Sequence, residues 1–246
     1  MADESTLGAR AGAALVARAV RFAEAAGFDV IGASREGKPI YGGLVGRPSM
    51  PAERPVVVMA GIHGDEPASV GALLDLAGAL QTGAATPVHP VYLVPALNPD
   101  GLEVNRKNSA SDVDLNRNFA ARNFTTEHKP GYFPGPAALS EPETRAFAAV
   151  VDRLDPAGVV AIHAPFACIN YDGPARAWAE AVAAASGWPP EGEIGYPTPG
   201  SLGSWLGVDR RSPVLTIELP RGPLDDFRAQ ALRALVAAVT NSPAKE

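Results

Sequence analysis

The sequence predicts a single α/β domain with a mixed, mostly parallel β-sheet and helices on both faces. Short apolar runs rich in β-branched residues alternate with segments suited to helices, and this alternation is typical of a largely parallel sheet. A length of 246 residues and a hydrophobic content of 46% are sufficient for a substantial core. Neither an internal repeat nor a linker interrupts the pattern, so we expect residues 1–246 to form one domain.

The first expected element is an amphipathic helix that runs from about Ser5 to Ala25 and ends at Gly27. Two acidic residues precede its apolar stretch and two arginines interrupt it, whereas a signal peptide needs a basic start and an unbroken apolar core. We therefore expect residues 1–27 to belong to the domain and not to be a signal peptide. No later apolar run of about 20 residues could span a membrane, so we expect a cytoplasmic protein.

A hairpin is expected next, followed by strands that alternate with helices. Residues 29–33 and 39–45 flank a short polar turn, which favours a hairpin at a sheet edge. The later strands are short apolar runs, at residues 56–60, 91–97, 159–163, 166–171 and 214–219. The later helices are expected at residues 67–80, 140–154, 174–186 and 223–239.

Local signals define the turns and the start of one helix. Ser140, with Glu143 three residues later, predicts a capping box. The sequence Asn-Pro-Asp-Gly at residues 98–101 predicts a turn. Residues 102–136 have little regular pattern and residues 187–207 are rich in glycine and proline. A loop as long as the first of these, inside a compact domain, is more often functional than idle.

The composition excludes several classes of function. The net charge of −6 at pH 7 leaves no basic surface of the kind that binds nucleic acid or anionic membranes. Cys168 is the only cysteine, so neither an intrachain disulfide nor a cysteine zinc cluster can form. A single cysteine suits a reducing compartment.

Polar side chains follow the ends of four apolar runs. His63 and Glu66 come after residues 56–60, Asn98 follows the next strand, and His163 and Glu218 lie at the ends of two more. Ligands bind beyond the carboxyl ends of strands in such sheets. One histidine alone is more often structural, but a carboxylate at the end of a buried strand is costly unless it is paired or used. Together they offer three metal ligands, an open position and a carboxylate, which is the composition of a catalytic zinc site.

The long loop contributes possible substrate-binding groups. Residues 112–119 hold two acids, two amides and an arginine, which a solvated surface loop would also explain. Asn116 and Arg117 could offer an amide and a guanidinium fork to a carboxylate. Arg106 could face charge that develops on a carbonyl oxygen. Spacing alone does not decide between these readings.

Several motifs together resemble the zinc carboxypeptidases related to carboxypeptidase A. They occur in the family's order and span residues 29–219. They are Gly61-Ile62-His63-Gly64-Asp65-Glu66, Asn98-Pro99-Asp100-Gly101, Asp114-Leu115-Asn116-Arg117-Asn118-Phe119, the later His163, and Thr216-Ile217-Glu218-Leu219. The resemblance implies one zinc ion held by His63, Glu66 and His163, and Glu218 as general base and acid. It also implies that Asn116 and Arg117 bind the terminal carboxylate and that Arg106 polarises the scissile carbonyl.

A closer resemblance is to bacterial murein peptide amidases. It rests on the stretch 195–203 that precedes residues 216–220. It implies a cytoplasmic metallocarboxypeptidase that cuts the γ-D-glutamyl–meso-diaminopimelate bond of recycled murein tripeptide. Tyr196 lies in the region where the digestive enzymes carry a mobile tyrosine, and Tyr196 and Ser201 are candidates for substrate binding.

Two other functions are compatible with these residues. A deacylase of the aspartoacylase or succinylglutamate desuccinylase type shares the zinc motif and also cleaves amides. A non-catalytic protein could keep the fold to bind a peptide, although such a protein would be expected to lose a ligand or the base.

Overall fold

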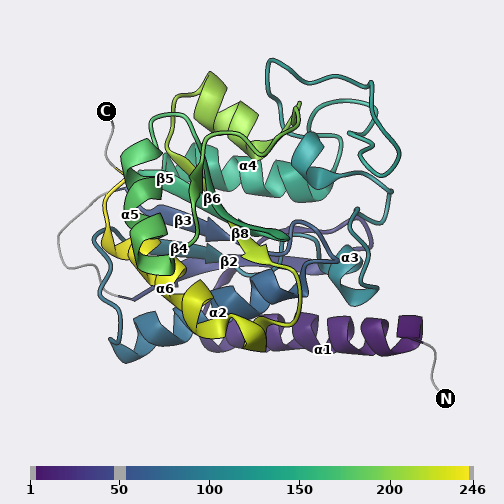
Figure 1. The fold of residues 1–246 in the computed structure, drawn as a ribbon. Helices are drawn as coiled ribbons and strands as arrows, with labels where there is room; N and C mark the ends of the chain where they lie inside the picture. Colours follow the sequence, from purple (N-terminus) through teal and green to yellow (C-terminus); the bar gives the residue numbers. More distant parts are fainter. Residues whose placement is uncertain (1–3, 47–53, 244–246) are drawn as a thin grey trace.

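One eight-stranded sheet runs through the computed structural model, which describes residues 4–46 and 54–243 (Figure 1). The strands lie in the order β1-β2-β4-β3-β5-β8-β6-β7. Their bounds are β1 (Asp29–Ala33), β2 (Pro39–Val45), β3 (Val56–Met59), β4 (Val91–Val94), β5 (Gly158–His163), β6 (Phe166–Asp172), β7 (Pro190–Glu191) and β8 (Val214–Pro220). The central strands β4, β3, β5 and β8 are parallel, whereas β1, β2 and β6 pair antiparallel with neighbours. The predicted fold class is confirmed.

Helices cover both faces of this sheet, and each face has its own hydrophobic core. One core joins inward-facing strand residues such as Val58 and Leu215 to α1 (Glu4–Ala25), α2 (Pro67–Thr82), α5 (Arg176–Ser186) and α6 (Arg228–Thr240). The other joins the alternate strand residues, such as Val57 and Val159, to α4 (Pro142–Leu154). Figure 1 shows α4 on one side of the sheet and α1, α2 and α6 on the other. None of the described helices combines the length and the apolar character that crossing a membrane would require.

The predicted capping box does not form. Helix α4 begins at Pro142, and its N-cap residue Glu141 makes no side-chain cap hydrogen bond. The Ser140 hydroxyl instead accepts a hydrogen bond from Asn118 Nδ2 at 2.9 Å, and Glu143 accepts one from the backbone amide of Arg35 at 2.8 Å. Contacts with distant loops therefore replace the reciprocal bonds that the local sequence favours.

Two further predictions need correction. Strand β4 ends at Val94 and not at residue 97, because the next residue is Pro95, which has no N–H to donate to a sheet. The expected turn at residues 98–101 is the start of a short helix, α3 (Pro99–Glu103). Asn98 caps it by accepting a hydrogen bond from the Gly101 amide at 2.9 Å.

The long loops contain short helical turns that the sequence pattern does not predict. A 3₁₀ turn, η1 (Leu115–Arg117), lies within the first loop. A π-helical segment, η2 (Gly203–Asp209), begins inside the second, and a 3₁₀ turn, η3 (Leu224–Asp226), precedes α6. Segment η1 carries Asn116 and Arg117, and η2 lies against Asp172, the last residue of β6. Both segments help to form the site described next.

Candidate active site

The three predicted metal ligands meet at the carboxyl edge of the sheet. His63 and Glu66 lie in the loop after β3, and His163 ends the neighbouring strand β5. His63 Nδ1 is 2.8 Å from one Glu66 carboxylate oxygen, and His163 Nδ1 is 3.1 Å from the other. The three ligand atoms lie within 4.8 Å of one another. Two imidazoles and one carboxylate are the donor set of a catalytic zinc site.

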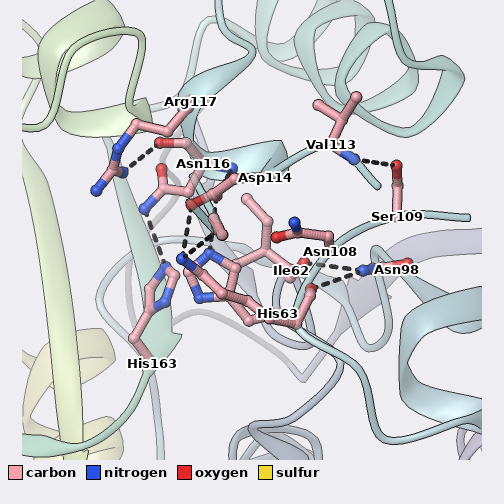
Figure 2. A network of polar contacts seen from close by, with 12 residues as sticks. Ile62, His63, Asn98, Asn108, Ser109, Val113, Asp114, Asn116, Arg117 and His163 are labelled. Atoms are coloured by element: carbon pink, nitrogen blue, oxygen red, sulfur yellow. Dashed lines mark hydrogen bonds and ion pairs between the residues drawn. The ribbon is translucent and has the colours of Figure 1, made fainter. Parts of the chain in front are cut away.

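A buried carboxylate orients the first of these histidines (Figure 2). Asp114 Oδ1 lies 3.1 Å from His63 Nε2 and accepts a hydrogen bond from the backbone N–H of Asn116 at 2.9 Å. When His63 Nε2–H donates to Asp114, the lone pair on Nδ1 is free for a cation. The sequence motif contains Asp114, but our sequence reasoning gave it no role; the general need of a metal-binding histidine for such a partner could have suggested one.

The charges around the ligands favour a cation between them. Burial lowers the pKa of His63, but the charges of Glu66 and Asp114 outweigh burial and raise this pKa to about 10. Burial raises the pKa of Glu66, but His63 and His163 outweigh it and lower this pKa to about 2. The carboxylates therefore stay ionised and attract positive charge to the ligand atoms. The residues present fit a zinc ion in charge as well as in donor type.

Glu218 lies beside this metal centre with an unused oxygen. It is paired with His163 in the register of β5 and β8, and it is 5% exposed. Its Oε2 is buried and makes no hydrogen bond within the described part of the chain. Burial raises its pKa, with partial compensation from the positive charge of His163. A buried carboxylate with a raised pKa in a cavity is typical of a general base.

Asn116 and Arg117 line the same cavity, which has a volume of about 310 Å³. The Asn116 side-chain oxygen accepts a hydrogen bond from the Leu202 amide at 3.0 Å, so it connects η1 to the loop before η2. Its amide nitrogen lies 3.5 Å from His163 Nε2. Arg117 is only 6% exposed, and Nη1 donates to the Asn116 carbonyl at 2.7 Å. The structure thus brings both residues to the metal ligands and Glu218.

Tyr196 and Ser201 also line this cavity, in different ways. Tyr196 is 38% exposed and lies near Phe166, with ring centroids 6.3 Å apart. It also borders a second cavity of about 580 Å³, together with Arg117 and Tyr132. The Ser201 hydroxyl is bonded within its own loop, where it accepts from the Ser204 amide at 3.0 Å. Tyr196 is therefore the more exposed of the two side chains.

Arg106 is not among the described residues that line the cavity. Its side chain is exposed, and Nη2 donates to the Ser109 carbonyl at 3.2 Å. The neighbouring Lys107 lines the cavity instead, with Nζ 2.8 Å from Asp114 and 3.7 Å from the centroid of the Tyr132 ring. Our sequence reasoning did not single out Lys107 or Tyr132, and no spacing signal in this irregular loop could have found them.

Asp172, at the end of β6, also lines the cavity, and the sequence reasoning missed it as well. Burial raises the pKa of its carboxyl group to about 6. The folded chain thus holds this proton more tightly than the unfolded chain does. The resulting stabilisation is present at acid pH and is lost as the pH rises from about 4 to about 6.

We expect Asp172→Asn to stabilise the protein at pH 7.5 but not at pH 4.5. The amide removes a buried charge that exists only above the raised pKa. A gain of about 1 kcal/mol at pH 7.5 corresponds to a rise in Tm of about 2–4 °C for a domain of this size. Thermal unfolding of both proteins at the two pH values measures this. An equal Tm difference at both values would contradict the prediction.

A model of the zinc carboxypeptidase family matches residues 13–177. The chain belongs to this family. The resemblance inferred from the motifs is confirmed, and His63, Glu66 and His163 form its zinc-ligand triad.

Individual relatives agree with this zinc carboxypeptidase assignment. Murein peptide amidase A of Escherichia coli (strain K12) is 35% identical over 232 residues, which cover 89% of this chain and 91% of the relative. The crystal structure of murein-tripeptide amidase MpaA from Escherichia coli O157 has a TM-score of 0.72 and 29% identity, and the match covers 88% of this chain and 93% of that one. A carboxypeptidase A from Helicoverpa armigera shares the fold, with a TM-score of 0.70 at 19% identity over 85% of this chain and 66% of that chain.

Proposed function

We propose that this zinc carboxypeptidase removes the C-terminal residue of murein tripeptide, by hydrolysing the γ-D-glutamyl–meso-diaminopimelate amide. The Glu218 carboxylate lies beside the zinc triad, and its Oε2 has no hydrogen-bond partner among the described residues; this free oxygen carries the hydrolytic part of the proposal. The murein substrate is supported by the similarity to murein peptide amidase A over most of both chains.

Glu218 is the proposed proton carrier. Zinc, when bound, supplies a Lewis acid that makes water acidic enough to lose a proton near neutral pH. The carboxylate of Glu218 accepts that proton as the water oxygen bonds to the amide carbon. When the carbon–nitrogen bond breaks, Glu218 returns the proton to the leaving amine. Burial keeps the pKa of Glu218 above its usual range, which favours both uptake and return of the proton.

Arg117 and Asn116 are proposed to bind the carboxylate of the residue that is released. A guanidinium forms two parallel hydrogen bonds with a carboxylate, which also fixes its orientation. The Asn116–Leu202 hydrogen bond holds the amide in place at the cavity wall. Arg106 remains a proposed donor to the scissile carbonyl, and it would have to leave the Ser109 carbonyl to act there. Tyr196 and Ser201 are proposed to contact the substrate.

Arg117→Ala is expected to raise KM strongly for peptides with a free C-terminal carboxylate. A hydrogen bond to a charged group contributes about 1.5–3 kcal/mol, which corresponds to a loss of roughly ten- to a hundredfold in kcat/KM. Steady-state kinetics on a peptide and on its C-terminal amide measures the effect. An equal loss on both substrates would contradict carboxylate binding by Arg117.

A substrate panel separates the proposed activity from the two alternatives. The zinc-loaded protein is incubated with the murein tripeptide and with N-acetyl and N-succinyl amino acids, with and without chelator. We expect the protein to cleave the tripeptide and not the N-acyl amino acids, and we expect chelator to abolish this cleavage. Preferential cleavage of the N-acyl amino acids would indicate a deacylase, and binding of the tripeptide without turnover would indicate a non-catalytic protein.

A further inference from the structure

We propose that Lys107 tunes the zinc site through Asp114 and His63, by drawing negative charge away from the carboxylate that His63 contacts. The charge of Lys107 weakens zinc binding and leaves the bound cation more electrophilic. This role is independent of the murein substrate, because it concerns the metal centre alone. Lys107 acts through other residues, so it is a positioning residue of the site.

Lys107 and His63 contact the two different oxygens of one buried carboxylate. Lys107 Nζ lies 2.8 Å from Asp114 Oδ2, and His63 Nε2 lies 3.1 Å from Asp114 Oδ1. The Asp114 side chain has an exposed fraction of 0%. Polar interactions are stronger in such a buried environment than in water. The ammonium, the carboxylate and the imidazole therefore form one continuous chain of contacts that ends at a metal ligand.

The position of Asp114 does not depend on Lys107. The backbone N–H of Asp114 donates to the Phe133 carbonyl at 2.8 Å. Its Oδ1 accepts a hydrogen bond from the backbone N–H of Asn116 at 2.9 Å. These two bonds hold the carboxylate beside His63 without help from the ammonium. What Lys107 adds at the other oxygen is a positive charge.

Lys107 is itself held at Asp114, although it lines the cavity. The Tyr132 ring lies beside the ammonium, with its centroid 3.7 Å from Nζ. The Lys107 carbonyl accepts a hydrogen bond from the Gly64 N–H at 3.1 Å, which ties Lys107 to the loop that carries His63. Removing one partner of a buried ion pair is costly. We therefore assign the ammonium to Asp114 and not to the substrate.

The charge on Asp114 decides how strongly His63 donates to a cation. A carboxylate that accepts the ring N–H makes the imidazole a more basic ligand. An ammonium on the other carboxylate oxygen shares the negative charge, so the imidazole gives less charge to the cation. A cation that receives less charge is bound less tightly and polarises a carbonyl or a water molecule more strongly. Lys107 therefore exchanges some zinc affinity for Lewis acidity.

The zinc affinity of Lys107 variants tests the inference without turnover. Lys107→Met removes the ammonium and keeps an unbranched stem. We expect it to bind zinc about tenfold more tightly, a change of the size that partners of metal ligands cause. Lys107→Arg keeps the charge and should bind zinc like wild type. Competition against a chromogenic chelator measures the dissociation constants, and an unchanged or weaker affinity in Lys107→Met would overturn the inference.

Two further variants separate this route from a general effect of charge. Lys129→Met removes an exposed positive charge from the loop that also carries Tyr132, and it should keep the zinc affinity of wild type. In an Asp114→Asn background, Lys107→Met should no longer tighten zinc binding, because no carboxylate remains for the ammonium to neutralise. Equal tightening in Lys129→Met, or undiminished tightening in the Asp114→Asn background, would show that the effect does not pass through Asp114.

Turnover gives a second measurement, and this one rests on the proposed function. With zinc-loaded proteins and murein tripeptide, Lys107→Met should lower kcat by about tenfold with little change in KM, and Lys107→Arg should restore kcat. A higher KM with unchanged kcat and zinc affinity would show instead that Lys107 binds the substrate. If wild type does not cleave the tripeptide, the proposed function fails, while the zinc affinities still decide the role of Lys107.

Discussion

Glu218→Gln will keep its zinc and lose nearly all turnover. The amide has the shape of the carboxylate but cannot accept the proton that water must lose. General acid–base catalysis by one side chain contributes about 10²–10⁴-fold, so we expect kcat to fall by about that factor. Activity on the murein tripeptide and elemental analysis of the purified variant measure the two quantities together.

A matched control separates this effect from a general loss of charge. Glu180→Gln makes the same substitution on the exposed surface of α5, where Glu180 pairs with Arg176. This variant should retain wild-type kcat and zinc content. A Glu218→Gln protein with near-normal kcat would show that Glu218 is not the base, and loss of its zinc would show that Glu218 acts in metal binding.

His163→Ala will lose the metal and, with it, the activity. The variant retains only His63 and Glu66 of the three-ligand set, and these two side chains already lie 2.8 Å apart. Zinc content should fall from about one ion per chain to near zero after dialysis, because catalytic zinc sites use three protein ligands. Elemental analysis and tripeptide turnover are the measurements, and added zinc should restore chelated wild type but not the variant.

His89→Ala is the corresponding control. This histidine contacts the Arg54 carbonyl and the Ser242 hydroxyl, away from the cavity. It should retain zinc and activity. Full zinc occupancy in His163→Ala would remove this residue from the metal site.

The parts of the fold that depend on local pattern could be predicted from the sequence. The apolar runs at β3, β5 and β8 are fully buried or nearly so, and such runs signal a parallel sheet without knowledge of their partners. The sequence also predicted that His63, His163 and Glu218 lie close together, because parallel strands bring their carboxyl ends to one edge of the sheet.

The parts that depend on distant contacts could not be predicted. Ser140 and Glu143 match a capping box, but Asn118 and Arg35 take their hydrogen bonds. Asp172 looks like an ordinary acid at a strand end, and only the approach of η2 makes it a half-buried residue of the cavity wall. Nothing in the local sequence distinguishes Arg106 from Lys107 as the side chain that faces the ligands.

The supporting residues illustrate the same difference. Asn98 was expected to form a turn, yet it is fully buried and its amide nitrogen lies 3.3 Å from the Ile62 carbonyl and 3.2 Å from the Lys107 carbonyl. It thereby joins the loop that carries His63 to the loop that carries Arg106 and Lys107. A motif that reads locally as a turn holds two parts of the site together.

Release of diaminopimelate from L-Ala-γ-D-Glu-meso-diaminopimelate tests the central claim most directly. Chromatographic assay of the zinc-loaded protein should show equal amounts of free diaminopimelate and L-Ala-γ-D-Glu, with release abolished by chelator and by Glu218→Gln. Failure of the zinc-loaded wild type to release diaminopimelate, under conditions where it cleaves an N-acyl amino acid, would contradict the account.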